Sequence, residues 1–166
     1  MMGLLKRIRG AVTGNSGEDQ DWIAVDGVGD TAALLRVVAE TMPSGALLNI
    51  VKPRSAEVER FLQSNKTGAS NVEEGDFYLS MSGSAVAQLA DLVGQIDPEP
   101  AFGAVLVTLD GSNLLEAYRR DLNEDVVWLS SSLPADMLAR AREGLDTIVQ
   151  NGAAVSHTPA LRARSA

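Results

Sequence analysis

The residues with the clearest chemical potential form a glycine-rich turn after the first apolar run, where Gly27 and Gly29 lie between Asp26 and Asp30. The segment GVGDTA fits the pattern G-x-G-x-x-A, in which glycines between a strand and a helix let a pyrophosphate approach the helix amides. Lys52, at the end of the second apolar run, could contact a 2′-phosphate, whereas the two aspartates would repel phosphate unless a cation bridged them. One interpretation is therefore a small nucleotide- or metal-binding enzyme. The interpretation we favour is a tight structural turn whose Asp30 caps the following helix.

A second candidate site is an acidic segment that precedes a tryptophan. Asp121, Glu124 and Asp125 lie between two predicted strands, and Trp128 follows within the second of them. Loops on a rigid strand pair often serve in recognition, and an exposed tryptophan with charges at its rim can anchor a protein partner. We predict a partner-binding surface here. The competing interpretation is that Trp128 is buried in the core, which would leave only a solvated acidic loop.

The sequence lacks the residues that nucleophilic catalysis usually needs. It contains no cysteine, and its single histidine, His157, lies in the tail. A serine nucleophile needs a neighbouring base, so Ser130–Ser132 carry no catalytic prediction. The acidic clusters do not have the spacing of a calcium-binding loop. We therefore predict no catalytic residue, no metal site and no cofactor.

Charge is distributed unevenly along the chain. All 22 acidic residues lie between Glu18 and Asp146, together with nine of the 14 basic residues, so this stretch has a formal charge of −13. Such a surface repels phosphate backbones, which argues against nucleic-acid binding, and it attracts basic proteins. We expect a protein partner of basic character. The most specific form of this prediction is an immunity-type inhibitor that covers a basic toxin.

An internal repeat predicts the elements that position these residues. The segments that begin at Asp21 and Asp76 share their apolar positions at a spacing of 55 residues, so that Leu34 corresponds to Leu89. Each segment reads as a strand, an amphipathic helix and a second strand, which is typical of a duplicated unit. The predicted strands are Trp22–Val25, Ala46–Val51, Phe77–Met81, Ala104–Leu109 and Val126–Ser130, and helices are predicted to begin at Asp30 or Thr31, Ser55, Ser84 and Pro134.

One segment fits two structures. Ser112–Leu122 has helical spacing of its apolar residues, but Asp110-Gly111 between two apolar runs is a strong hairpin signal because both residues tolerate positive φ. We predict the hairpin, with Asn113–Arg119 as its return strand.

The second half of the chain carries a further set of motifs. These are Phe77-Tyr78-Leu79, Leu89-Ala90-Asp91-Leu92, Asp110-Gly111, Leu114-Leu115-Glu116-Ala117-Tyr118, Val127-Trp128-Leu129-Ser130 and Pro134. On these residues, positions 77–145 resemble a group of uncharacterised bacterial proteins. The resemblance implies the same hairpin, and it implies no activity.

The two ends differ from the body in composition. Residues 1–17 form a basic amphipathic segment and a linker, which could dock on the body, touch an anionic surface or fray. The final helix is predicted to end at Gly152, and residues 153–166 are predicted to be a disordered tail. Residues 18–152 then form one globular domain, with repeat units at about 21–65 and 76–152.

Together these observations predict a single α/β domain with a mixed sheet of about six strands and helices packed on it. We expect a non-enzymatic, acidic interaction protein of the bacterial cytoplasm, which the absence of cysteine fits. No apolar run approaches the ~20 residues of a membrane span. The sequence leaves open whether copies of the chain associate.

Overall fold

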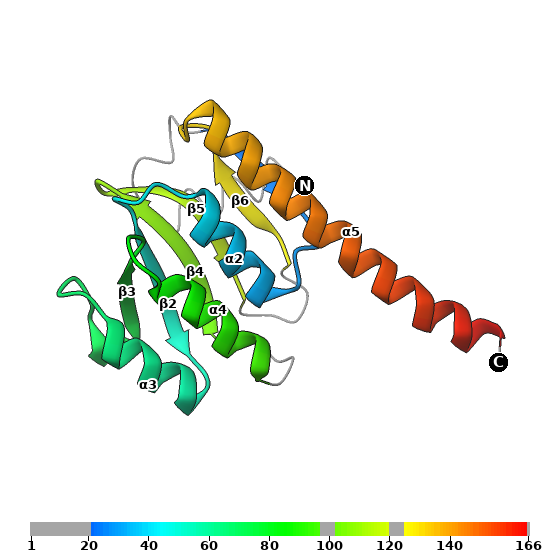
Figure 1. The fold of residues 1–166 in the computed structure, drawn as a ribbon, viewed down its shortest axis with the longest axis horizontal. Helices are drawn as coiled ribbons and strands as arrows, with labels where there is room; N and C mark the ends of the chain where they lie inside the picture. The colour runs from blue at the N-terminus through cyan, green and yellow to red at the C-terminus, as the bar shows by residue number, and fades with distance from the viewer. Residues whose placement is uncertain (1–20, 97–101, 120–124, 166) are drawn as a thin grey trace.

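The computed structural model describes residues 21–96, 102–119 and 125–165, with side chains up to residue 152. Figure 1 shows one sheet with the helices in front of it. The strands are β1 (Trp22–Val25), β2 (Leu47–Pro53), β3 (Asp76–Ser80), β4 (Phe102–Leu109), β5 (Ser112–Tyr118) and β6 (Val127–Ser130). The helices are α2 (Thr31–Thr41), α3 (Ala56–Asn65), α4 (Ala85–Gln95) and α5 (Ala135–Ser165), and a short 3₁₀ helix (Val72–Glu74) precedes β3. The predicted α/β fold, with helices packed on a six-stranded sheet, is confirmed.

The strand order is β1-β6-β5-β4-β2-β3, and every neighbouring pair is antiparallel. The mixed character predicted for the sheet is therefore wrong. Two strand–helix–strand units were expected to place parallel strands side by side. Instead, β1 and β2 run in the same direction but are separated by β6, β5 and β4, and β3 and β4 are separated by β2. Antiparallel pairing results because another strand fills each gap.

The predicted hairpin is confirmed. Asp110 and Gly111 connect β4 to β5, and both have positive φ, +52° and +80°. Two central residues with positive φ match the twist of the flanking strands, which explains why Asp-Gly suits this position. The helical alternative for Ser112–Leu122 is wrong over its described residues, because Ser112–Tyr118 is a strand.

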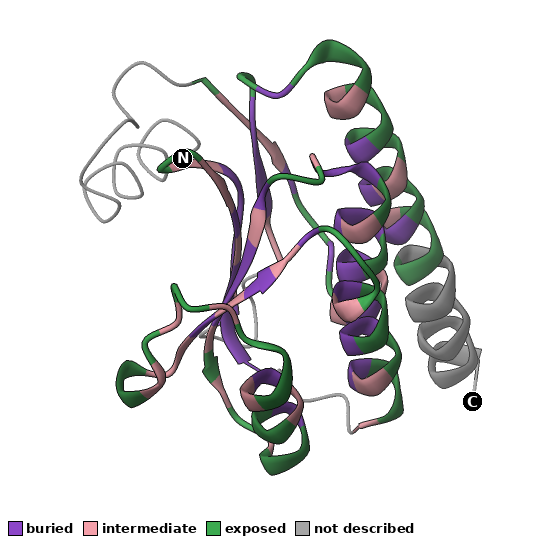
Figure 2. Cartoon of the chain, turned by 60° about the vertical axis from the view of Figure 1, so that its left-hand side comes forward, coloured by how far each residue is buried: buried purple, intermediate pink, exposed green. Residues whose placement is uncertain are grey.

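Helices α2, α4 and α5 cover one face of the sheet, as Figure 2 shows. Side chains alternate between the two faces of each strand, and those that point to the helices form the core. Fully buried examples are Leu48, Ile50, Phe77, Leu79, Val105, Val107, Leu115 and Leu129. Burying each of these side chains contributes about 1.5–3 kcal/mol. We call the opposite side of the sheet the open face.

The two helices of the repeat occupy comparable places in the core. Leu34 of α2 and Leu89 of α4 have no exposed surface, as the repeat interpretation requires. The guanidinium of Arg36 lies 3.2 Å from the carboxylate of Asp91, its counterpart in the repeat. Both side chains are more than half exposed, so this pair contributes at most about 1 kcal/mol. The helices thus meet through equivalent positions, whereas the outer strands β1 and β3 have different neighbours.

Helix α5 packs on α2 and then extends past the rest of the fold (Figure 1). Its 31 residues correspond to roughly 46 Å at 1.5 Å per residue. The predicted end at Gly152 is wrong, because the helix continues to Ser165 through the segment predicted to be disordered. A glycine often follows the last residue of a helix, but a glycine inside a helix costs only about 1 kcal/mol relative to alanine and does not force an end.

Across the described part of the chain, none of the helices combines the length and apolar character needed to cross a bilayer.

Candidate functional site

The glycine turn between β1 and α2 has the geometry of a capped structural turn. Gly27 adopts a φ of +88°, and Val28 is fully buried beneath the turn. The carboxylate of Asp30 accepts a hydrogen bond of 3.0 Å from the amide of Ala33 and so caps α2. A phosphate at this helix end would have to compete with that carboxylate for the amides.

Lys52 does not join this turn. It lies near the end of β2, which is separated from β1 by three other strands, so about 19 Å lie between β1 and β2 at the ~4.8 Å spacing of strands. Lys52 has a φ of +53°, and its amide donates a hydrogen bond of 2.7 Å to the carbonyl of Gly75. The residues of the alternative ligand site therefore fall in two separate places: Asp26, Gly27, Gly29 and Asp30 in the turn, and Lys52 across the sheet.

Asp125 connects the two candidate sites that the sequence analysis treated separately. Its carbonyl accepts a hydrogen bond of 2.8 Å from the amide of Val28. Its carboxylate lies over Gly29, where an added Cβ would be 3.3 Å from an Asp125 oxygen. The Asp125 carboxylate thus lies against Gly29, the second glycine of the turn, where a phosphate-binding loop would need room for the phosphate. Asp121 and Glu124 lie outside the described residues.

Arg119 holds Asp125 in this position. Its guanidinium is only 4% exposed and lies 3.4 Å from the carboxylate of Asp125, which is 45% exposed. Burial lowers the pKa of Arg119, and the nearby Asp125 carboxylate opposes that shift. The amide of Arg119 also donates to the carbonyl of Gly103 at 2.7 Å. The end of β5, the residues before β6 and the glycine turn are therefore joined by this ion pair together with the backbone hydrogen bond from Val28 to Asp125.

Trp128 is buried, at 7% exposure, so it is not an exposed anchor beside an acidic loop. It lies on the open face of β6, opposite Glu116 of β5 and Ala24 of β1. The two interpretations given for Trp128 assumed either an exposed anchor or a residue of the main core. The structure places it on the other side of the sheet from the main core.

The open face carries a buried acid that the sequence analysis did not single out. Glu116 is 1% exposed. One of its carboxylate oxygens accepts a hydrogen bond of 3.1 Å from the side-chain amide of Asn113, and the other accepts one of 3.2 Å from the hydroxyl of Tyr118. Both donors lie on the same strand as the acid. The sequence did contain a signal for this residue, namely a glutamate within an otherwise apolar strand. Charged residues are seldom fully buried unless they have partners, so such a glutamate indicates either an exposed position or a buried hydrogen-bonded group.

A second polar group lies on the same face at the other end of the sheet. The side-chain amide of Asn49, itself 4% exposed, donates to the carboxylate of Asp76 and to the carbonyl of Phe77. Burial raises the pKa of Tyr78, and the neighbouring Asp76 carboxylate raises it further. Asp76 and Glu116 are the only acidic residues in the six described strands, and both belong to the open face.

Strand register connects these two groups into one row across the open face. The row runs in order through Tyr78, Asn49, Leu106, Glu116, Trp128 and Ala24. Exposure changes along it. Glu116 of β5 and both Trp128 and Ser130 of β6 are almost fully buried, whereas Leu47 and Val51 of β2 and Leu106 of β4 are half-buried. We call the part of the open face at Glu116, Trp128 and Ser130 the covered half, and the part on β2, β3 and β4 that holds these half-buried apolar residues the accessible half; Asn49 and Ala104 are buried within the latter.

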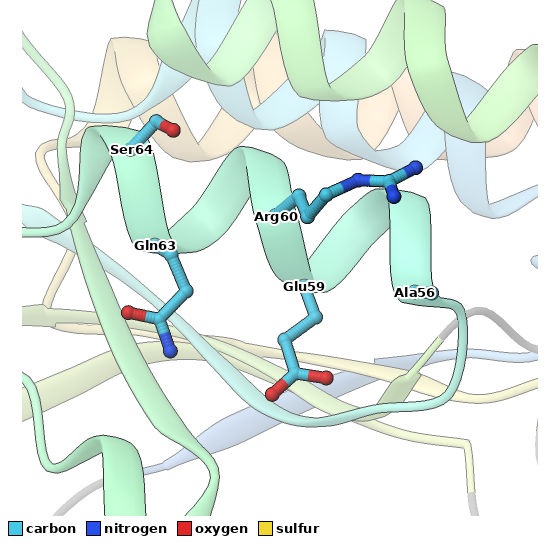
Figure 3. Close-up of a pocket in the computed structure, with 5 residues that line it drawn as sticks. All are labelled: Ala56, Glu59, Arg60, Gln63 and Ser64. Carbon is cyan, nitrogen blue, oxygen red and sulfur yellow. The ribbon is translucent and has the colours of Figure 1, made fainter.

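The surface also has a depression along α3, which Figure 3 shows. It is lined by Ala56, Glu59, Arg60, Gln63 and Ser64, all of one helix. Glu59 and Gln63 extend from one side of α3 and Arg60 from the other. Because a single helix supplies all five residues and their side chains extend in different directions, they do not converge on a common point as a ligand site requires.

Among the described side chains, no three His, Cys, Asp or Glu residues gather closely enough to hold a metal ion. No protein-family model, no curated protein and no solved structure matches this chain.

Proposed function

We propose that this chain is a non-enzymatic binding protein that takes a basic protein partner on the accessible half of its open face. The observation that carries this proposal is the placement of acid and apolar surface together. Asp76 and Tyr78 of β3 lie beside the half-buried Leu47, Val51 and Leu106. Apolar side chains and tyrosine are typical of the centre of protein interfaces, and charged side chains are typical of the surrounding rim.

Positioning of the acid supports specific recognition. Asn49 is buried and holds the Asp76 carboxylate through its side-chain amide, so this charge does not have to be ordered when a partner binds. A prepositioned carboxylate loses less entropy on forming a charge-assisted hydrogen bond with a lysine or arginine. The formal charge of −13 between Glu18 and Asp146 adds long-range attraction, which speeds association with a basic protein at low salt.

A site-specific photo-crosslinking experiment tests this proposal. A photoreactive amino acid replaces Thr108 on the open face of β4 or, as a control, Glu143 on the exposed side of α5. We expect the Thr108 variant, and not the Glu143 variant, to capture a defined basic protein in the native host. Binding of that protein, once purified, should be lost in Asp76→Lys and kept in Asp146→Lys. Crosslinking of the protein by the Glu143 variant alone, or equal binding of the purified protein by Asp76→Lys and Asp146→Lys, would refute this assignment.

An immunity-type inhibitor remains the most specific form of the proposal. Its support is the same acidic surface, since toxins that act on nucleic acid present basic surfaces. In that case the captured protein should be toxic when expressed alone. Co-expression of this chain should restore growth, and co-expression of Asp76→Lys should not.

A further inference from the structure

A cluster of polar side chains lies at the β3 edge of the accessible half. Asn49 of β2 is opposite Tyr78 of β3, and its side-chain amide donates to the carboxylate of Asp76, the preceding residue of β3 on the same face. The Asp76 carboxylate in turn lies close enough to the phenol of Tyr78 to raise its pKa. These groups therefore act on one another, and they border the half-buried apolar residues of β2 and β4.

The cluster presents hydrogen-bond acceptors to solvent. Both hydrogens of the Asn49 side-chain amide are already used, by Asp76 and by the carbonyl of Phe77. The side-chain oxygen of Asn49, the second carboxylate oxygen of Asp76 and the phenol oxygen of Tyr78 accept no hydrogen bond from the described part of the chain, and none of them is a buried atom without a partner. These oxygens therefore reach solvent. A complementary ligand must supply N–H donors, and a positive charge beside the carboxylate strengthens the bond.

The outer edge of β3 is closed, so a partner must approach over the open face. The amide of Tyr78 donates to the hydroxyl of Ser70 at 2.9 Å, and its carbonyl accepts from the amide of Thr67 at 2.8 Å. The backbone of Asp76 exchanges hydrogen bonds of 3.0 and 2.7 Å with Asn71. An added strand would need these same backbone groups. Recognition at this edge therefore uses side chains, whose backbone is fixed before a partner binds.

We propose that this cluster is a binding site for an arginine side chain of the basic partner. The inference rests on the proposed function and names the group that the partner inserts. A guanidinium carries N–H donors in a planar fork and no acceptor, which complements a carboxylate with further acceptors beside it. It also stacks on aromatic rings such as that of Tyr78, and it is more weakly hydrated than an ammonium, which suits a partly apolar surface. A lysine ammonium, a compact and strongly hydrated charge, fits this site less well.

Model compounds test the site in the full chain without the partner. N-acetylarginine methylamide is titrated into the isotope-enriched protein and followed by nuclear magnetic resonance, with the lysine and citrulline derivatives in parallel, because citrulline keeps the shape of arginine without its charge. We expect the arginine derivative to cause saturable shifts of the Asp76 and Tyr78 backbone amides and of the Asn49 side-chain amide. The lysine derivative should bind more weakly, and the citrulline derivative should cause no shift. Asp76→Asn should weaken binding of the arginine derivative by at least about tenfold, since it removes a charge-assisted hydrogen bond, whereas Asp146→Asn on α5 should leave it unchanged.

The absence of saturable shifts at these residues, equal shifts with citrulline, or equal affinity for the lysine derivative would overturn the arginine site. The photo-crosslinking experiment separates this failure from failure of the proposed function. Capture of a basic protein through Thr108 without any response to the arginine derivative would retain the proposed function and refute the arginine site. A response to the arginine derivative without capture of a protein through Thr108 would support the site and refute the proposed function.

Discussion

Two glycines of α5 provide a test of how closely this helix packs on α2. A Cβ added at Gly144 would lie 2.9 and 3.1 Å from the two γ-carbons of Val37 in α2. A Cβ added at Gly152 would meet nothing within 4 Å. Both residues are helical, so alanine gains the same backbone term at each, about 0.5–1 kcal/mol. The difference between the two substitutions therefore measures the contact with Val37.

Gly144→Ala should lower the free energy of unfolding although alanine favours the helix. Forcing a methyl group into a filled contact costs typically 1–3 kcal/mol, and valine adjusts poorly because its χ1 is restricted in a helix. After the propensity gain is subtracted, we expect a net loss of about 1 kcal/mol. Gly152→Ala should instead gain about 0.5–1 kcal/mol. Urea denaturation, with midpoints compared at constant slope, measures both values.

A double-mutant cycle identifies the contact responsible. In a Val37→Ala background both γ-carbons are gone, so Gly144→Ala should become stabilising by about 0.5–1 kcal/mol, like Gly152→Ala. A loss from Gly144→Ala that persists in this background would place the clash elsewhere. Equal stabilisation by Gly144→Ala and Gly152→Ala in the otherwise unchanged chain would refute the close approach of α5 to α2.

Three further predictions concern the candidate sites. Because burial and Asp76 raise the pKa of Tyr78 above its ordinary value of 10.0, its phenol should ionise later than exposed tyrosines in an ultraviolet titration, and Asp76→Asn should remove the smaller part of the shift. Because the folded state favours the neutral phenol, the raised pKa of Tyr78 adds to the free energy of unfolding below pH ~10, and this contribution is lost as the pH rises toward the pKa in the folded state. Tyr78→Phe should therefore reduce the loss of stability at alkaline pH. Asp125→Ala should lower the free energy of unfolding by about 1–2 kcal/mol, because it removes an ion-pair partner of the buried Arg119. This value is below the usual cost of breaking a buried pair because Asp125 is half exposed. Asp146→Ala on α5 should change the free energy of unfolding little in the same denaturation assay. Nucleotide with Mg²⁺ should leave the thermal midpoint unchanged; stabilisation approaching the ~2.7 kcal/mol given by ligand at 100 times its dissociation constant would instead support the nucleotide-binding interpretation.

Local features of the fold were predictable because their causes are local. Asp30 and Ser55 precede helices as expected, since short polar side chains favour helix starts. Asp110-Gly111 predicted its hairpin because few other residues accept positive φ at both positions. In each case neighbouring residues alone determine the conformation.

The order of the strands was not predictable by the same means. The apolar pattern of β1 and β2 fits two adjacent parallel strands as well as two strands separated by β4, β5 and β6. Both arrangements bury the same residues, so hydrophobic periodicity does not distinguish them. The contact of Asp125 with the glycine turn depends on that order and was missed for the same reason.

The acid on the open face was missed because alternation does not say which face is covered. In β5, Leu115 and Ala117 point to the helices, and Glu116 points away from them. A polar residue on the second face of an antiparallel strand is ordinarily solvated. The 1% exposure of Glu116 in the structure, and not the alternation pattern, shows that this one is buried.

The pairing of β1 with β6 also affects how the chain acquires its structure during synthesis. Strand β6 is completed about 105 residues after β1, which corresponds to roughly 5–20 s at translation rates of 5–20 residues per second. During that interval the apolar residues of Trp22–Val25 have no partner strand, whereas β2, β3 and β4 can already pair with one another. Contacts between distant segments also slow folding through the entropy of closing a large loop. A nascent chain stalled before Val127 should therefore contain a protease-resistant β2–β4 region and an accessible β1, and this exposed strand is where a chaperone would bind.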